Sequence, residues 1–274
     1  MEFILLAIIG LLSGVVGALV GLGGGIILVP ATIFVGITLG LIDGITPQSV
    51  VGLSVVMMVF VGLGSTLSYM KIKTIDYRSS IIFFIGSIPG TLLGAYVNKG
   101  LEIKSFNLYF GILLIFLATL LLVRKYLKPI YWFRNHGKTR TFTDKMGETY
   151  TFGYPIWFAL LLTFGIGFAS GLFGIGGGSI IVPAMILLFL FPPHVAVGTS
   201  MFMVFLSAIV NSITHISLGN VPWLYTIPVV PAAYIGAKLG AKLNQKMKSE
   251  TLVVALRIVL LLLGIRSIIE GLMG

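Results

Sequence analysis

The sequence contains one glycine-rich stretch twice, and this repeat constrains the fold more than any other feature. The first copy spans residues 21–31 (GLGGGIILVPA) and the second spans residues 174–184 (GIGGGSIIVPA). At an offset of 153 residues, 8 of the 11 positions are identical. Because so long a period occurs only twice, it indicates duplication of half a protein rather than a solenoid.

The glycine runs interrupt an apolar chain. With 57% hydrophobic and only 9% charged residues, against about 25% charged in soluble domains, the composition is that of a polytopic membrane protein. Each glycine costs a helix roughly 1 kcal/mol relative to alanine. In a bilayer, non-helical backbone is tolerated only where it is buried in protein or lines a cavity. The runs therefore predict two breaks inside the membrane.

A helix that starts at such a break directs unpaired N–H groups and the positive end of its dipole toward the break. We therefore interpret each copy as half of an anion-binding centre. Tight packing of helices through small residues is the alternative. It accounts for Gly14, Gly17 and Gly21 but poorly for a repeated run of three glycines. The predicted centre comprises Gly23, Gly24 and Gly25 from the first copy, and Gly176, Gly177, Gly178 and Ser179 from the second.

Apolar segments predict an all-α fold of ten helical elements, five in each half. The first repeat (residues 1–123) contains elements at about 3–20, 26–41, 49–70, 79–97 and 106–123, and the second (residues 154–274) at about 154–173, 179–191, 195–217, 223–241 and 251–271. The first element is taken as a retained helix and not as a cleaved signal, because no basic segment precedes it. A basic linker, residues 124–153, joins the repeats.

An odd number of elements in each half gives the two halves opposite orientations. Inverted repeats with interrupted helices are the architecture of many secondary transporters, with the substrate site at the repeat interface. The positive-inside rule places the linker in the cytoplasm and both termini outside. The cytoplasmic set is Lys71, Lys73, Arg78, Arg124, Lys125, Lys128, Arg134, Lys138, Arg140, Lys145, Lys242, Lys246 and Lys248, against Lys99, Lys104 and Arg266 opposite.

The net charge of +10 and the aromatic residues of the linker raise the question of nucleic-acid binding. The cations gather in loops between helices, which favours interfacial anchoring on anionic lipid instead. We expect the lipid bilayer and a small anion as partners, and no nucleic acid.

Polar side chains follow one face of the third element of each half. In the second half this stripe comprises Ser200, Ser207, Asn211 and Thr214, with His215 beside it, and Ser54 is the equivalent of Ser200 at an offset of 146. Uncharged hydroxyl and amide groups suit an oxyanion that must be released again, since a buried cation would hold it more tightly. Serine and threonine also bond to their own helix backbone, which is the simpler explanation for any single position.

One pair of residues marks corresponding helix starts, and one histidine could titrate near the polar stripe. Gln48 and His194 occupy corresponding helix starts, where capping is the first interpretation and gating the second. His215 is the titratable group nearest the stripe, so proton coupling is left open. A homodimer is left open as well.

The absences are equally informative. The chain contains no cysteine, no GxxxxGK[ST] phosphate loop and no dinucleotide fingerprint. No carboxylate falls deep within a predicted span, and no triad or metal-ligand cluster is visible. We therefore expect no enzyme, no cofactor and no metal.

The doubled GxGGGxxxVP element and the VG[LT]S segments that follow it resemble the sulfite exporter TauE/SafE family, also known as the 4-toluenesulfonate uptake permease family. The resemblance covers both halves. It implies an inner-membrane permease for sulfite, sulfoacetate, other organosulfonates or thiosulfate, driven by ion gradients. It also implies roles for the glycine runs with Pro30 and Pro183, and for Ser54, Thr199 and Ser200. A passive anion channel and a non-transporting membrane scaffold or assembly factor are the alternatives.

Overall fold

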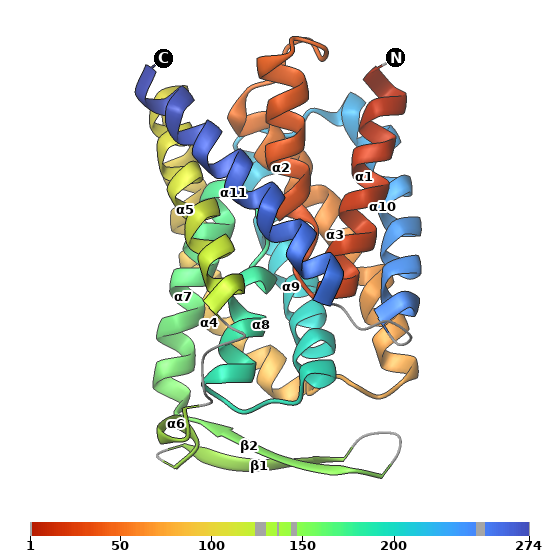
Figure 1. Ribbon diagram of the computed structural model, residues 1–274, viewed down its shortest axis with the longest axis vertical. Helices are drawn as coiled ribbons and strands as arrows, with labels where there is room; N and C mark the ends of the chain where they lie inside the picture. Colours follow the sequence, from red (N-terminus) through yellow and green to blue (C-terminus); the bar gives the residue numbers. More distant parts are fainter. Residues whose placement is uncertain (1, 124–129, 136, 144–146, 245–249, 274) are drawn as a thin grey trace.

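The computed structural model describes residues 2–123, 130–135, 137–143, 147–244 and 250–273, and helices dominate it (Figure 1). Six of the described helices are long and apolar enough to cross a membrane, namely α1, α3, α4, α5, α7 and α9. The predicted all-α polytopic membrane fold is confirmed. Of the expected linker, residues 124–129, 136 and 144–146 lie outside the described residues.

Each half begins with a helical hairpin that turns at the glycine-rich stretch. In the first half, α1 (Glu2–Val20) is followed by the short α2 (Gly25–Ile33) and a π-helical turn (Phe34–Thr38). In the second half, α7 (Ile156–Phe173) is followed by α8 (Gly178–Leu187). The expected elements 26–41 and 179–191 therefore end a few residues early, and α2 and α8 are too short to span a bilayer.

Both hairpins return to the end of the bundle at which they began. The Tyr225 hydroxyl donates to the Asp43 carbonyl beyond α2 and also reaches the Glu2 carboxylate at 3.5 Å. The segment beyond α8 lies beside the strand that leads into α7, because the Gly153 N–H donates to the Phe189 carbonyl. One hairpin therefore enters from each end of the molecule.

Three longer helices follow each hairpin. They are α3 (Pro47–Lys71), α4 (Tyr77–Lys99) and α5 (Ile103–Val123), then α9 (Pro193–Ser217), α10 (Trp223–Asn244) and α11 (Glu250–Met273). Figure 1 shows both chain ends at one end of the bundle and the strands of the linker at the other. The two halves therefore have opposite orientations, as their odd number of elements predicts.

The halves interlock through small residues. α1 packs along α10, and α7 packs in the equivalent way along α4. A Cβ added at Gly14 would overlap the Ala233 carbonyl, and one added at Gly171 would overlap the Thr91 carbonyl. These close approaches are the small-residue packing that the sequence allowed for Gly14. The third helices α3 and α9 also pack together, as do the fifth helices α5 and α11.

The linker contains structure that the sequence analysis missed. A short helix α6 (Trp132–Asn135) precedes two antiparallel strands, β1 (Lys138–Thr143) and β2 (Thr149–Tyr154), paired from Lys138↔Tyr154 to Thr143↔Thr149. Buried aromatic rings attach this hairpin to the bundle, with Phe152 stacked on Phe191 at a centroid distance of 3.8 Å. The linker is therefore a small folded unit at the end of the bundle opposite the termini.

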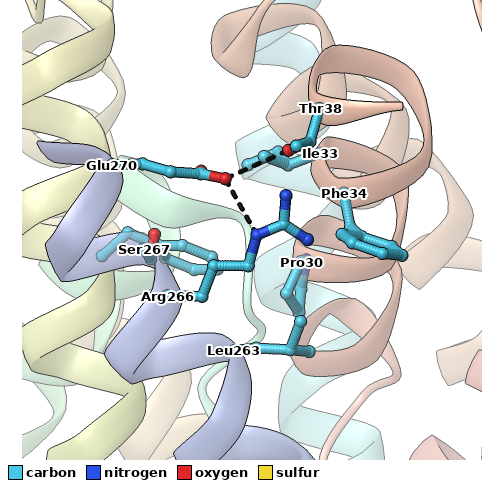
Figure 2. Close-up of a pocket in the computed structure, with 9 residues that line it drawn as sticks. Pro30, Ile33, Phe34, Thr38, Leu263, Arg266, Ser267 and Glu270 are labelled. Atoms are coloured by element: carbon cyan, nitrogen blue, oxygen red, sulfur yellow. Dashed lines mark hydrogen bonds and ion pairs between the residues drawn. The ribbon is translucent and has the colours of Figure 1, made fainter. Parts of the chain in front are cut away.

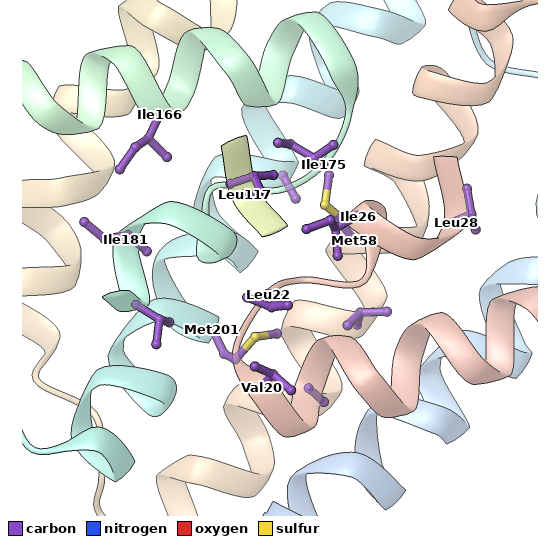
Figure 3. Close-up of a cluster of buried hydrophobic side chains, with 14 of the residues drawn as sticks. Val20, Leu22, Ile26, Leu28, Met58, Leu117, Ile166, Ile175, Ile181 and Met201 are labelled. Atoms are coloured by element: carbon purple, nitrogen blue, oxygen red, sulfur yellow. The ribbon is translucent and has the colours of Figure 1, made fainter. Parts of the chain in front are cut away.

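Apolar side chains surround the two breaks. Figure 3 shows Leu22 and Ile26 beside one break and Ile175 beside the other, with Met58 between them. All four side chains are at most 1% exposed. The breaks thus lie in the centre of the protein and not against lipid.

Candidate functional site

Glycine is required at both breaks because the backbone adopts left-handed conformations there. Gly21, Gly23 and Gly24 have φ values of 81°, 85° and 88°, and Gly174 and Gly176 have values of 64° and 72°. Side chains with a Cβ rarely adopt this region, so glycine is the residue that makes the turn without strain. The three-glycine runs thus lie at breaks between helices, as predicted, and the chain reverses its direction at both, which the sequence had left open.

The two breaks meet. A Cβ placed on Gly23 would lie 3.8 Å from the Gly176 Cα, and one placed on Gly176 would lie 3.7 Å from the Gly23 Cα. The first helical residues cross over: a Cβ on Gly25 would overlap the Gly174 carbonyl, and one on Gly178 would overlap the Gly21 carbonyl. The two glycine runs therefore lie side by side, and a side chain at Gly25 or Gly178 would overlap the backbone of the other run.

Ser54 and Ser200 tie each third helix to the break of the other half. The Ser54 hydroxyl on α3 donates to the Gly174 carbonyl at 2.6 Å. The equivalent Ser200 hydroxyl on α9 donates to the Gly21 carbonyl at 2.9 Å. Both serines are fully buried. In this conformation their hydroxyl protons are therefore bonded to backbone oxygen.

A second pair of side chains, Tyr69 and His215, bonds carbonyls near the ends of α1 and α7 with the same symmetry. The Tyr69 hydroxyl donates to the Ala18 carbonyl at 2.8 Å, and the equivalent His215 Nε2 lies 3.0 Å from the Gly171 carbonyl. These carbonyls lack helical partners at a helix end.

The third pair comes from the ends of the fourth helices. Asn98 Nδ2 donates to the Leu172 carbonyl at 2.8 Å, and Asn244 Nδ2 donates to the Leu19 carbonyl at 2.6 Å. Sequence reasoning missed this pair, although the two asparagines are equivalent at the offset of 146 that already relates Ser54 to Ser200.

The donor groups at the breaks show the opposite situation. Within the described residues, the N–H groups of Gly24, Gly25 and Ile26 at the start of α2 make no hydrogen bond. The same holds for Gly177, Gly178 and Ser179 at the start of α8. At each break a serine of the other half thus bonds one carbonyl oxygen, while these amide donors make no hydrogen bond at the positive end of a short helix.

Asn211 and Ser179 lie at the second break. Asn211 Nδ2 donates to the Ser170 carbonyl at 3.2 Å, while its Oδ1 is buried without a partner among the described residues. The Ser179 hydroxyl donates to the Gly176 carbonyl at 3.3 Å. Elsewhere on the stripe, the Thr214 hydroxyl bonds its own helix at the Val210 carbonyl, as the simpler interpretation expected.

Thr199 belongs to a polar cluster that joins α9, α4 and the linker hairpin. Its hydroxyl accepts from the Asp76 N–H at 3.0 Å. The Ser79 hydroxyl donates to Asp76 Oδ2 at 2.5 Å, and Arg140 lies 3.5 Å from the same oxygen. Burial raises the pKa of Tyr154, so its hydroxyl stays protonated and donates to Ser79 Oγ at 2.6 Å. The hairpin is therefore linked to Thr199, the residue next to Ser200, through Ser79 and Asp76.

Gln48 caps a neighbouring helix. Its Nε2 donates to the carbonyls of Asn98 (3.3 Å) and Leu101 (2.8 Å) at the end of α4. His194 occupies the corresponding start of α9, and its ring contacts Tyr150 of the linker hairpin edge-on at 5.4 Å. Each residue therefore connects two neighbouring elements, Gln48 at one end of the bundle and His194 at the other.

Pro30 and Pro183 lie inside α2 and α8. Pro30 borders a small cavity where α11 packs against α2 (Figure 2). Arg266 Nε lies 2.9 Å from Glu270 Oε1, and its guanidinium stacks over the Phe34 ring at 4.1 Å. The cavity holds about 20 Å³, which is enough for one water molecule and too small for an organic anion.

Comparison with known proteins agrees with this architecture. A family model described as "Sulfite exporter TauE/SafE" matches residues 6–267. The chain belongs to the sulfite exporter TauE/SafE family. It is 48% identical over 271 residues, covering 99% of both chains, to the probable membrane transporter protein YunE of Bacillus subtilis.

More distant relatives extend the comparison. A probable membrane transporter protein of Methanocaldococcus jannaschii is 30% identical over 95% of this chain and 93% of its own. "Sulfite exporter TauE/SafE family protein 6" of Arabidopsis thaliana is 36% identical over 32% of this chain and 20% of its own. No solved structure matches. This TauE/SafE protein is thus a multi-pass membrane protein of a transporter family.

Proposed function

We propose that this TauE/SafE protein is a secondary transporter that carries small sulfur-containing oxyanions, such as sulfite, sulfoacetate, other organosulfonates or thiosulfate, across the cytoplasmic membrane. The observation that carries the proposal is the pair of helix starts whose amide donors are unbonded where the two breaks meet. Two converging sets of N–H groups match the several acceptor oxygens of a sulfite or sulfonate group.

The chemistry of the centre favours an anion that is released again. Within the described residues the centre offers backbone amides and the neutral side chains of Ser54, Ser200 and Asn211, with no lysine or arginine among its contacts. Neutral donors hold an anion less tightly than a buried cation does, and they need no counter-charge when the site is empty. Such a site suits transport better than storage.

The symmetric contacts suggest how access could alternate. Each third helix is bonded to the break of the other half through one serine, and each fourth helix packs on the first helix of the other half. Rocking of one half against the other would lengthen one set of these bonds at a time. The Ser54 and Ser200 hydroxyls could then turn from the carbonyls to the anion.

The proposed orientation follows the distribution of cations. The linker hairpin would lie in the cytoplasm, and both termini would lie outside. Coupling to a proton gradient would involve His215, which is fully buried. Because its Nε2 faces a carbonyl, it donates there, and its Nδ1 accepts from Asn220 Nδ2 at 3.1 Å. A second proton would have to displace the Asn220 contact, which links protonation to the break.

Counterflow in proteoliposomes tests the function. Vesicles preloaded with unlabelled sulfite should transiently accumulate labelled sulfite, and sulfoacetate or thiosulfate should compete, whereas acetate should not. A passive channel would equilibrate the label without accumulation. A scaffold would show no flux above that of protein-free vesicles.

A matched pair of variants at one position tests the site. Ser179→Pro removes one backbone donor in the first turn of α8, where proline is tolerated, and Ser179→Ala keeps that donor and removes only the hydroxyl. A hydrogen bond to a charged group contributes about 1.5–3 kcal/mol, so Ser179→Pro should weaken apparent affinity about 10- to 150-fold. Ser179→Ala should stay within a few-fold of wild type. Equal transport by both variants would contradict the proposed amide site.

A further inference from the structure

A second cavity lies away from the glycine breaks, between the ends of α3 and α10. It measures about 470 Å³ and is lined by Leu67, Ser68, Lys71, Ile72, Lys238 and Lys242. Volumes of about 300–1,000 Å³ are typical of sites for small organic ligands. The proposed transport function assigns it no role.

Three lysine side chains converge on this cavity. Lys238 and Lys242 are four residues apart, so they share one face of α10, and Lys71 is the last residue of α3. No carboxylate lies within ion-pair distance of any of the three in the part of the chain that the structure describes. Within the described residues, the cavity therefore concentrates positive charge without a neutralising carboxylate.

Lys238 lies deeper than a lysine at a helix end. It precedes the last residue of α10 by six positions, which corresponds to about 9 Å along the axis. Its ammonium group lies over the Tyr234 ring at 4.4 Å from the centroid. A cation at this depth is costly in a membrane unless it finds a partner.

The fold does not require these lysines. The equivalent positions of the other half lie on α9 and α4, which also pack together, because residues of the third and fourth helices correspond at an offset of 146. There Ser217 replaces Lys71, Leu92 replaces Lys238 and Tyr96 replaces Lys242. These three positions lie toward the end that carries the chain termini, whereas the lysines lie toward the end that carries the linker hairpin. Lysines thus occupy only one of the two equivalent sets of positions.

The surroundings of the cavity are apolar and exposed. Leu67 on its rim and Ile235 and Leu239 on α10 are 42%, 55% and 48% exposed, as expected of side chains that face lipid. An occupant of this place would thus have an anionic group among the lysines and hydrocarbon along α3 and α10.

We propose that this groove binds the phosphate headgroup of an anionic phospholipid from the cytoplasmic leaflet, with its acyl chains along α3 and α10. The leaflet rests on the orientation given under the proposed function, whereas the binding itself does not. Basic pockets between membrane helices on the cytoplasmic side are recognised sites for such headgroups, and each lysine near the surface contributes about 1 kcal/mol, or about fivefold in affinity.

Thermal unfolding of the purified protein in neutral detergent tests the proposal. Phosphatidylglycerol should raise the apparent melting temperature more than phosphatidylcholine does. Lys71→Gln/Lys238→Gln/Lys242→Gln should lose most of this difference. Lys99→Gln/Lys104→Gln, which removes two cations at the opposite end, should keep it. Lys71→Arg/Lys238→Arg/Lys242→Arg should keep it as well.

Two further measurements complete the test. The first distinguishes a lipid headgroup from free phosphate, and the second uses only the wild-type protein, so it does not depend on whether a variant folds. Inorganic phosphate at millimolar concentration should not reproduce the shift, because it lacks the acyl chains. Native mass spectrometry of the wild-type protein should show phosphatidylglycerol retained in preference to phosphatidylcholine. An undiminished shift in the glutamine variant, full stabilisation by inorganic phosphate alone, or equal retention of the two lipids would overturn the lipid site. None of these readouts depends on transport, so this proposal and the proposed function fail independently.

Discussion

Replacing Ser54 or Ser200 by alanine should destabilise the protein, because each hydroxyl is the only described partner of a break carbonyl. The Gly174 carbonyl accepts from Ser54 and the Gly21 carbonyl accepts from Ser200, and no other donor reaches either oxygen in the described part of the chain. Leaving a buried carbonyl unbonded costs about 1–3 kcal/mol. Each substitution should therefore lower the free energy of unfolding by that amount.

Ser65 supplies the matched control. It lies on the same helix as Ser54 and is equally buried, but its hydroxyl donates to the Val61 carbonyl of its own helix at 2.7 Å. That carbonyl lies within the helix, so Ser65→Ala leaves no terminal oxygen without a donor. Its effect should stay within about 0.5 kcal/mol.

Thermal unfolding in detergent measures the difference. For a chain of this size, 1 kcal/mol corresponds to roughly 2–4 °C in melting temperature. Ser54→Ala and Ser200→Ala should thus melt about 2–12 °C below wild type, and Ser65→Ala within about 2 °C of it. If all three alanine variants melted together, the serine bonds to the breaks would contribute nothing and the reasoning would be refuted.

Other predictions concern the breaks and the linker. Gly25→Ala and Gly178→Ala place a Cβ against the backbone of the opposite break and should destabilise the folded protein by about 3 kcal/mol. The Cβ of the control Gly165→Ala meets nothing within 4 Å, so this variant should be neutral or stabilising. Thermal unfolding compares all three variants. Asn98→Ala removes the donor to the Leu172 carbonyl and should cost about 1–3 kcal/mol in the same assay. Because burial raises the pKa of Tyr154, the stability due to its neutral hydroxyl is fully present below about pH 10 and is lost as pH rises through the raised value. Tyr154→Phe should therefore flatten the alkaline decline of the melting temperature, and an unchanged decline would count against this role.

The architecture could be predicted from the sequence because the duplication is visible in short local patterns. The repeated glycine runs and the apolar segments lie within short windows, so the breaks, the ten helices and the opposite orientation of the halves could be predicted. The bonding partners could not. Ser54 and Gly174 are 120 residues apart, and nothing in either segment indicates which carbonyl a buried hydroxyl reaches.

Two features were missed although the sequence carried signals for them. Asn98 and Asn244 are equivalent at the offset of 146, which would have predicted a paired role. The segments 138–143 (KTRTFT) and 149–154 (TYTFGY) are rich in threonine and aromatic residues and flank Gly147, a pattern typical of a β-hairpin. The basic composition of the linker obscured this pattern.

The central claim is that the unbonded amides of α2 and α8 bind one oxyanion between them. Selenite resembles sulfite and scatters anomalously, so diffraction data from crystals grown with selenite can locate it directly. We expect one strong anomalous peak between the N–H groups at Gly24–Ile26 and those at Gly177–Ser179, placed so that the selenite oxygens accept from both sets. A peak elsewhere, or none at a concentration that saturates transport, would contradict the claim.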